Sequence, residues 1–184
     1  MPVKINLRKP EFNLREKLNR LDTERIPYEK MPAGSVIQVQ QHHLYGSGQV
    51  QTSSSTFQDS GLYIDFYPKF ANSRLLVTCE FNAQSGNQTN SGLRWSIFRN
   101  IDGTTTTSSP SVNLLINSSQ QMTITFSSAS GYIHEGTSLT IEDKPKTIKK
   151  VQYRLFFFSH NGSATVGVAR DWGGAHFTVM EVRE

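Results

Sequence analysis

The sequence predicts an all-β protein: a jelly-roll-like β-sandwich preceded by an extended arm and one short α-helix. From residue 34 onward, the chain consists of short segments in which apolar and polar residues alternate. Gly, Ser, Thr and Asn separate these segments, and no helical spacing of apolar residues occurs between them. About ten such segments are typical of a sandwich or barrel, and we favour an eight-stranded jelly roll with extra short strands.

The chain changes character near residue 34, which separates an N-terminal docking arm (residues 1–33) from a β-domain (residues 34–184). A length of 184 residues suits one domain with an appendage. A domain of about 150 residues can bury a sizeable core without disulfides. An arm joined to a compact domain is typical of a protein that docks with one end and displays the other, which favours assembly over catalysis.

The first part of the arm, residues 1–12, is expected to be extended, because Pro2 and Pro10 disfavour a helix there. Val3, Ile5 and Leu7 alternate with polar residues, so this stretch is suited to adding a strand to the sheet edge of another protein. The apolar side chains of the whole arm are its candidate docking residues: Val3, Ile5, Leu7, Phe12, Leu14, Leu18 and Leu21.

A short helix is expected at residues 13–21. Asn13 and Glu16 have the spacing of a capping box, and Leu14, Leu18 and Leu21 fall on one helical face. A helix of this length is marginal alone, so its leucines need a surface to pack against. That surface is either the chain's own domain or a neighbouring subunit or scaffold.

The β-domain is divided into strands by its alternation. The segment 75–81 gives the strongest pattern, because Leu75, Val77, Cys79 and Phe81 share one face, and Trp95 is expected in the core. Residues 103–110 form a polar loop. The expected strands are 35–40, 62–67, 75–81, 92–98, 112–116, 122–126, 132–133, 139–141, 151–158, 164–168 and 177–182.

The composition is low in charge, with 18% charged residues and a net charge of +4, so Ser, Thr, Asn and Gln carry most of the polarity. Such surfaces are common in extracellular, viral and cell-surface β-proteins. The basic residues of the arm, Lys4, Arg8 and Lys9, are too few to indicate nucleic-acid binding. The chain has no signal-peptide pattern and no apolar run of about 20 residues, so we expect a soluble protein made in a cytoplasm, without membrane insertion.

No catalytic motif occurs, and we expect no enzyme activity, no cofactor and no metal site within one chain. Cys79 is expected to be a small, buried apolar residue, and the sequence indicates no general base beside its thiol. His42 and His43 should point to opposite faces of a strand. A metal site shared between the subunits of a trimer is an alternative that the sequence does not test. The histidines lack metal-ligand spacing: His42, His43, His134, His160 and His176.

One group offers a contact for a sugar. Arg170, Asp171 and Trp172 lie in a turn-rich stretch, where an exposed indole could stack on a sugar ring while its charged neighbours bind hydroxyls. The alternative, which we favour, is that Trp172 folds over one end of the sandwich or is buried between subunits.

Several phrases resemble a group of tailed-phage virion proteins, especially those of marine phages. The first is MPAGSVIQV at residues 31–39. Similar short phrases occur at residues 67–77, 142–154 and 177–182, and the NLREKLNRLD segment of the arm resembles docking segments of phage structural proteins. The resemblance implies a trimeric or multimeric protein of the particle exterior, and the long loop at 103–110 departs from the group.

The sequence therefore predicts a non-enzymatic phage virion structural protein, docked by its arm and displaying its β-domain on the virion exterior. We expect a capsid decoration or head fibre, with a homotrimer and other capsid or tail proteins as partners. The alternative is a tail-fibre or receptor-binding protein that recognises a host surface glycan through loops such as 103–110 and 170–174. A more remote alternative is a free carbohydrate-binding or hydrolytic domain.

Overall fold

The chain falls into two units, Met1–Pro32 and Ala33–Glu184. Of the first unit, only residues 27–32 are described, and they contain a 3-10 turn, η1 (Tyr28–Lys30). The expected helix at 13–21 and the extended stretch 1–12 lie outside the described residues. The computed structural model describes residues 27–44, 49–85, 91–107, 111–115, 122–126, 133–160, 162, 164–169 and 174–184.

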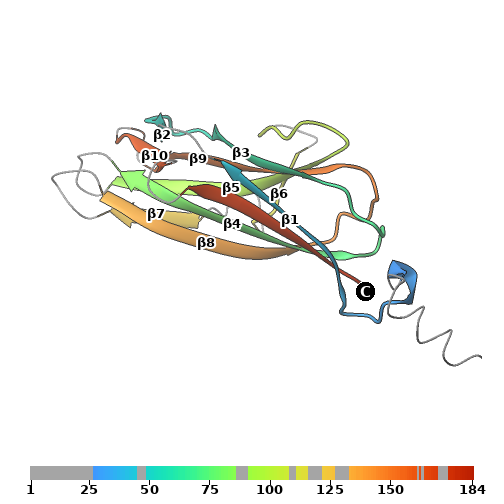
Figure 1. Cartoon of the computed structure of the whole chain (residues 1–184). Helices are drawn as coiled ribbons and strands as arrows, with labels where there is room; N and C mark the ends of the chain where they lie inside the picture. Colours follow the sequence, from blue (N-terminus) through green and yellow to red (C-terminus); the bar gives the residue numbers. More distant parts are fainter. Residues whose placement is uncertain are drawn as a thin grey trace, which may run out of the picture. The chain divides into compact units, whose positions relative to one another are not determined.

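The second unit is built from antiparallel strands in two sheets (Figure 1). One sheet contains β1, β2, β4, β8, β10 and β11, and the other contains β3, β5, β6, β7 and β9. The strands are β1 (Val36–Leu44), β2 (Gln49–Thr52), β3 (Gln58–Phe66), β4 (Arg74–Ser85), β5 (Ser91–Ile101), β6 (Val112–Asn113), β7 (Met122–Phe126), β8 (Ile133–Asp143), β9 (Val151–Ser159), β10 (Val166–Ala169) and β11 (Ala175–Val182).

Some of these segments are parts of one interrupted strand. Both β11 and β10 pair with the same edge of β4, because β8 occupies its other edge along Leu75–Ser85. Next to them, β1 pairs with β11 and β2 pairs with β10. In the second sheet, β6 and β7 share the edge of β5 that β9 leaves free. The pairs β1/β2, β6/β7 and β10/β11 therefore each act as one strand.

Counted in this way, the described part of the domain has eight strands, and their order identifies the fold. Numbered along the chain, the sheets read 1-8-3-6 and 2-7-4-5. The antiparallel pairs 1-8, 2-7, 3-6 and 4-5 are those of a long hairpin wrapped into two layers, which is the jelly roll. The predicted fold class is confirmed.

The core lies between the two sheets and follows from the alternation. Along β4 the odd-numbered residues from Leu75 to Ala83 are fully or almost fully buried, and the even-numbered residues are partly exposed. Trp95 is fully buried, as predicted, and its ring packs edge-on at 5.1 Å from Phe81. The inner faces of the two sheets supply these core side chains. Cys79 is one of them, and it is a free, buried cysteine.

A second apolar layer covers the other face of the five-stranded sheet. Phe98, Phe156 and Phe158 point away from the main core yet are almost fully buried. Phe57 packs edge-on against Phe98 at 5.2 Å and against Phe158 at 4.8 Å. Thr105, in the expected polar loop, is also buried, and its backbone N–H donates to Gln152 Oε1 at 2.7 Å. This layer explains why β9 is buried on both faces.

Glutamine side chains close one side of the sandwich. From β1, Gln38 Nε2 donates to the carbonyl of Tyr67 at 2.8 Å, and Gln40 Nε2 donates to the carbonyl of Asp65 at 2.9 Å. These amides satisfy backbone acceptors at the end of β3, which an edge strand otherwise exposes. The edges of β1 and β3 are thus joined across the two sheets.

The structure corrects three strand assignments. Ile133 of the expected strand 132–133 and the whole expected strand 139–141 belong to the single strand β8, which pairs with β4 over its whole length. Residue 132 lies outside the described residues. The expected strand 112–116 is reduced to Val112–Asn113. The strand β2 forms in a Ser/Thr-rich stretch where none was predicted, because β10 supplies a partner for it. None of the helices in the described part of the chain has the length and apolar character needed to cross a membrane.

Candidate functional site

The candidate residues from the sequence lie outside the described residues. This holds for the possible glycan contact Arg170, Asp171 and Trp172, and for the docking residues Val3, Ile5, Leu7, Phe12, Leu14, Leu18 and Leu21. The structure instead draws attention to the outer face of the six-stranded sheet, meaning the face turned away from the core.

A row of polar side chains crosses this outer face from strand to strand. The strand register places His43 of β1 opposite His176 of β11, His176 opposite Glu80 of β4, and Glu80 opposite Ser138 of β8. The rings of His43 and His176 are 5.0 Å apart. His42 points to the other face and stacks on Tyr63, so the predicted opposite orientation of the two histidines is confirmed.

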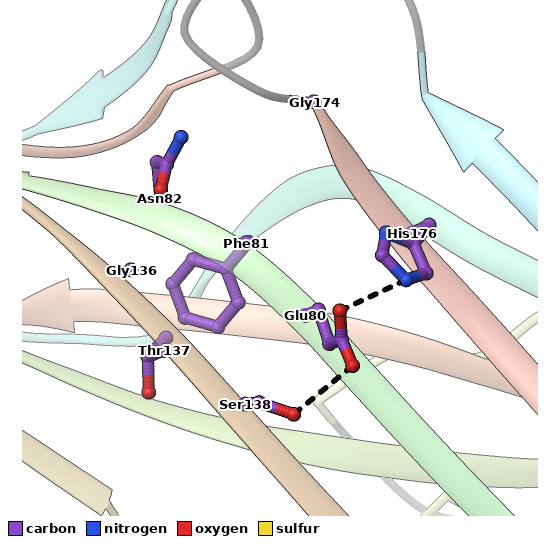
Figure 2. A pocket seen from close by; sticks show the side chains of 8 residues that line it. All are labelled: Glu80, Phe81, Asn82, Gly136, Thr137, Ser138, Gly174 and His176. Atoms are coloured by element: carbon purple, nitrogen blue, oxygen red, sulfur yellow. Dashed lines mark hydrogen bonds and ion pairs between the residues drawn. The ribbon is translucent and has the colours of Figure 1, made fainter.

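Glu80 is the centre of this row (Figure 2). Its Oε2 atom lies 3.1 Å from Nε2 of His176, and its Oε1 atom accepts a hydrogen bond from Ser138 Oγ at 3.3 Å. The Glu80 side chain is 44% exposed, and that of His176 is 26% exposed. The carboxylate is therefore fixed by two neighbours while it still faces solvent.

Beside Glu80 the surface is hollowed by about 270 Å³. Two glycines, Gly136 of β8 and Gly174 before β11, leave the space that side chains fill elsewhere on this face (Figure 2). Gly174 has a φ of 75°, a left-handed conformation that favours glycine. The hollow is lined by Glu80, Phe81, Asn82, Gly136, Thr137, Ser138, Gly174 and His176.

The order of the groups decides what the hollow can do chemically. A serine nucleophile needs an imidazole in contact with its hydroxyl, whereas here the carboxylate of Glu80 stands between Ser138 and His176. In the part of the chain that the structure describes, no group of three or more His, Cys, Asp or Glu residues is placed to hold a metal ion. The arrangement suits a different task, which is to receive a cation or a hydrogen-bond donor.

Cys79 lies on the opposite side of β4 and is fully buried. Burial raises the pKa of its thiol well above the usual value, and the neighbouring charge of Glu80 raises this pKa further. Because the thiolate is the reactive form of cysteine, the native domain holds this side chain in an inert state.

We therefore expect Cys79 to resist a thiol reagent such as a maleimide in the native protein at pH 8. Labelling should be slower than in urea by a factor on the order of a thousand or more, since it requires unfolding. Mass spectrometry over time measures the rate. The control is a Ser138→Cys variant, which places an exposed thiol on the same sheet and should react within the mixing time. Equal rates for both thiols in the native protein would contradict the expectation.

A second hollow, of about 450 Å³, lies over the five-stranded sheet. It is lined by two aromatic residues and three residues that carry hydroxyl groups: Phe57, Phe158, Ser55, Thr56 and Thr107. The adjacent turn is held by its own hydrogen bonds, among them Ser54 Oγ with Thr56 Oγ1 at 2.9 Å. Aromatic rings next to hydroxyl groups fit the amphipathic ring of a sugar.

Sequence reasoning missed the row on the outer face. Glu80 and His176 were each noted without a partner, because they are far apart in the chain and meet only through the register of β4 and β11. The one signal in the sequence is that Glu80 and His176 both occupy outward positions of alternating segments.

Comparison with known proteins found solved viral structures to which the chain is similar. The chain is similar to the infectious bursal disease virus VP2 subviral particle, with 12% identity over 79% of this chain and 33% of that chain, and a TM-score of 0.40. It is also similar to infectious bursal disease virus strain Gx, with 9% identity over 79% of this chain and 36% of that one, and the same TM-score of 0.40. The chain spans about a third of the length of these structures. No protein-family model and no curated protein matches it.

Proposed function

We propose that this chain is a non-enzymatic structural protein of a tailed-phage virion, which displays its β-domain on the particle exterior as a capsid decoration or head fibre. The jelly roll, with its 1-8-3-6 and 2-7-4-5 sheets, is the observation that carries the proposal. This architecture is common in viral capsid and lectin domains. Two of the phrases that resemble tailed-phage virion proteins involve this domain: the phrase at residues 31–39 spans the start of the domain, and the phrase at 177–182 lies within it.

The docking element in this proposal is the arm, residues 1–33. The β-domain begins at a defined point, because the N–H of Gly34 donates to the carbonyl of Arg183 at 2.8 Å and the N–H of Arg183 donates to the carbonyl of Ser35 at 3.0 Å. In this proposal, the residues before this point bind a partner. The apolar residues from Val3 to Leu21 would then pack on another capsid or tail protein.

Self-association into a homotrimer is part of the same proposal. A jelly roll has sheet edges, and open edges are usually covered or blocked in native proteins. A closed symmetric ring of copies covers edges without leaving one exposed at the end. Among the described strands, β8 pairs with β4 alone, and its other edge supports this arrangement.

The test is deletion of residues 1–24. We expect the remaining protein to keep the far-ultraviolet circular dichroism of a β-domain and a cooperative thermal transition, yet to be absent from purified particles. Electron microscopy of labelled full-length protein should place it on heads. Incorporation of the deleted form at the normal level would refute the docking role of the arm, and label confined to tail tips would refute the decoration role.

The second candidate function is a tail-fibre or receptor-binding protein that recognises a host surface glycan. The hollow lined by Phe57, Phe158 and three residues that carry hydroxyl groups favours it, and Trp172 would contribute to a separate contact. In this case Phe57→Ala should lower adsorption of the phage to its host while particles still assemble. Unchanged adsorption would count against the glycan role.

A further inference from the structure

In the part of the chain that the structure describes, the outer edge of β8 has no partner over a run of residues without charge or proline. Gly136–Ile141 pairs with β4 alone among the residues that the structure describes. In an antiparallel ladder, every second residue of an edge strand turns its N–H and C=O away from its partner. Native proteins usually blunt such edges with charge, proline or a bulge. This run has none of these, whereas the β1 and β3 edges are joined by glutamines.

We propose that residues 3–9 of a second copy of this chain add to β8 as an antiparallel strand. The inference deepens the proposed self-association by naming the donor segment and the acceptor edge. In the arm, Pro2 and Pro10 flank a stretch of alternating apolar and polar residues that contains no proline. This stretch, Val3–Lys9, has the same length as the β8 segment Glu135–Ile141.

The faces of the two segments match in this register. Leu139 and Ile141 lie on the inner face of β8, are partly buried and pack against the core. Pairing Lys9 with Glu135 in antiparallel sense places Ile5 opposite Leu139 and Val3 opposite Ile141. Apolar residues directly opposite one another stabilise a sheet by about 0.2–1 kcal/mol per pair. The added strand would thus extend the core at its open side.

The charges also match in this register. Glu135 is exposed and makes no ion pair in the described part of the chain, and Lys9 would stand opposite it. On the outer face, Arg8 would stand opposite Gly136, at the hollow beside Glu80 (Figure 2). Because Gly136 has no side chain, the guanidinium has room to reach the carboxylate of Glu80, whose two oxygens suit the guanidinium fork.

We assign the arm to a second copy because exchange of identical segments between protomers is a low-cost route to a closed assembly. If residues 13–21 are helical, Tyr28–Lys30 keep their 3-10 turn and the rest of the arm is extended, the stretch from Lys9 to Gly34 spans about 60 Å. That reach is sufficient to cross to a neighbouring domain. Reciprocal exchange would cover one β8 edge in every copy.

The register is tested by mixing two single-cysteine chains of different mass, Asn6→Cys and Ser138→Cys, under mild oxidation. In the proposed register these residues face each other on the outer side, and native Cys79 is buried and does not compete. We expect a mixed disulfide between the two chains as the main product. The matched control is Gln41→Cys in place of Ser138→Cys, since Gln41 is exposed on the same face at the opposite edge of the sheet. This control should give at least tenfold less mixed disulfide.

A charge exchange provides an independent measurement. Glu135→Lys should raise the dissociation constant of self-association about tenfold, because an attraction becomes a repulsion between directly opposed residues. Adding Lys9→Glu in the same chain should restore the wild-type value, whereas Lys9→Glu combined with Glu142→Lys should not. Analytical ultracentrifugation gives these constants.

Three outcomes would overturn the proposal. If a chain that carries both Asn6→Cys and Ser138→Cys forms an intrachain disulfide, and the mixed single-cysteine chains form none, the edge is assigned to the chain's own arm. Dimers of Ser138→Cys alone at high yield would assign it to direct β8–β8 pairing. The third is the absence of any cross-link above the Gln41 control. Particle incorporation is scored separately, so a cross-linked protein missing from virions would refute the proposed function and leave the strand exchange standing.

Discussion

Replacing Glu181 with alanine is expected to lower the free energy of unfolding of the β-domain by about 3–4 kcal/mol, because it removes the acceptor of three partly buried donors. Glu181 lies near the end of β11 and is fully buried. Its Oε1 atom accepts from the backbone N–H groups of Lys69 at 2.9 Å and Phe70 at 3.1 Å. Its Oε2 atom accepts from Gln38 Nε2 at 2.7 Å.

The effect should be large because one carboxylate joins three parts of the fold. Gln38 belongs to β1, Glu181 to β11, and Lys69 to the turn that follows β3 in the other sheet. Hydrogen bonds to a charged group contribute about 1.5–3 kcal/mol each, and the loss is not additive. The buried carboxylate is therefore a connection between the sheets rather than a catalytic acid.

Equilibrium unfolding in urea measures this prediction. Glu181→Gln keeps one carbonyl oxygen and should cost clearly less than Glu181→Ala. Glu142→Ala is the matched control, because Glu142 is a half-exposed carboxylate on the same sheet and its loss should cost less than about 1 kcal/mol. Equal losses for Glu181→Ala and Glu142→Ala would show that the buried hydrogen bonds do not support the fold.

The parts of the fold that sequence predicted are those where burial alone sets the pattern. Leu75, Val77, Cys79 and Phe81 occupy every second position, and each is buried in the core. Thr78 and Glu80 are the polar residues between them, and Leu76 is the one apolar exception. Trp95 follows the same rule between Leu93 and Ile97, which are also fully buried. Since one face of a strand must meet the core, the period of two is visible without knowledge of its neighbours.

The remaining strands depend on partners that sequence does not reveal. In β8 the stretch Gly136–Ser138 is small and polar, so no alternation predicts a strand there, yet β4 holds it in the sheet along its whole length. Likewise, β2 has only Val50 as an apolar residue and is held by β10. The row of Glu80, His176 and Ser138 was invisible for the same reason, because the register between strands brings it together.

Replacing Asp143 with alanine is expected to cost about 3–5 kcal/mol, because it leaves a partly buried guanidinium without its counter-charge. Asp143 ends β8, and its Oδ1 atom lies 2.5 Å from Nη1 of Arg99 on β5. Its Oδ2 atom accepts the hydroxyl of Tyr153, on β9, at 2.7 Å. The Asp143 side chain is 7% exposed and that of Arg99 is 16% exposed. Water can therefore replace little of the interaction that Arg99 loses with the carboxylate.

A double substitution separates the charge from the packing. Asp143→Leu combined with Arg99→Met removes both charges and should recover part of the stability that Asp143→Ala loses, since apolar replacements of a buried ion pair are often neutral or stabilising. The part not recovered is the hydrogen bond of the buried Tyr153 hydroxyl, which loses its acceptor in both variants. Arg74→Ala is the control for an exposed pair, because Arg74 meets Glu142 at 3.4 Å with both side chains well exposed. It should cost less than about 1 kcal/mol.

Tyr153 provides a second readout of the same site. Burial raises the pKa of its phenol well above the usual value, and the charge and the hydrogen-bond acceptor of Asp143 raise it further, against the opposing effect of Arg99. A raised folded pKa means that this contribution to stability is fully present below about pH 10 and is lost as the pH rises through the folded value.

In Asp143→Asn the negative charge is gone while the side chain keeps its size, so the pKa of Tyr153 should fall relative to the wild type. Its phenolate absorbance should then appear at lower pH, with the remaining five tyrosines changed to phenylalanine in both backgrounds. Because burial is the first cause of the raised pKa, the phenol should still titrate above its usual value as long as the domain stays folded. A pKa that does not change on removal of the Asp143 charge would show that burial alone governs Tyr153, and the loss of stability in Asp143→Ala would then have to come from Arg99.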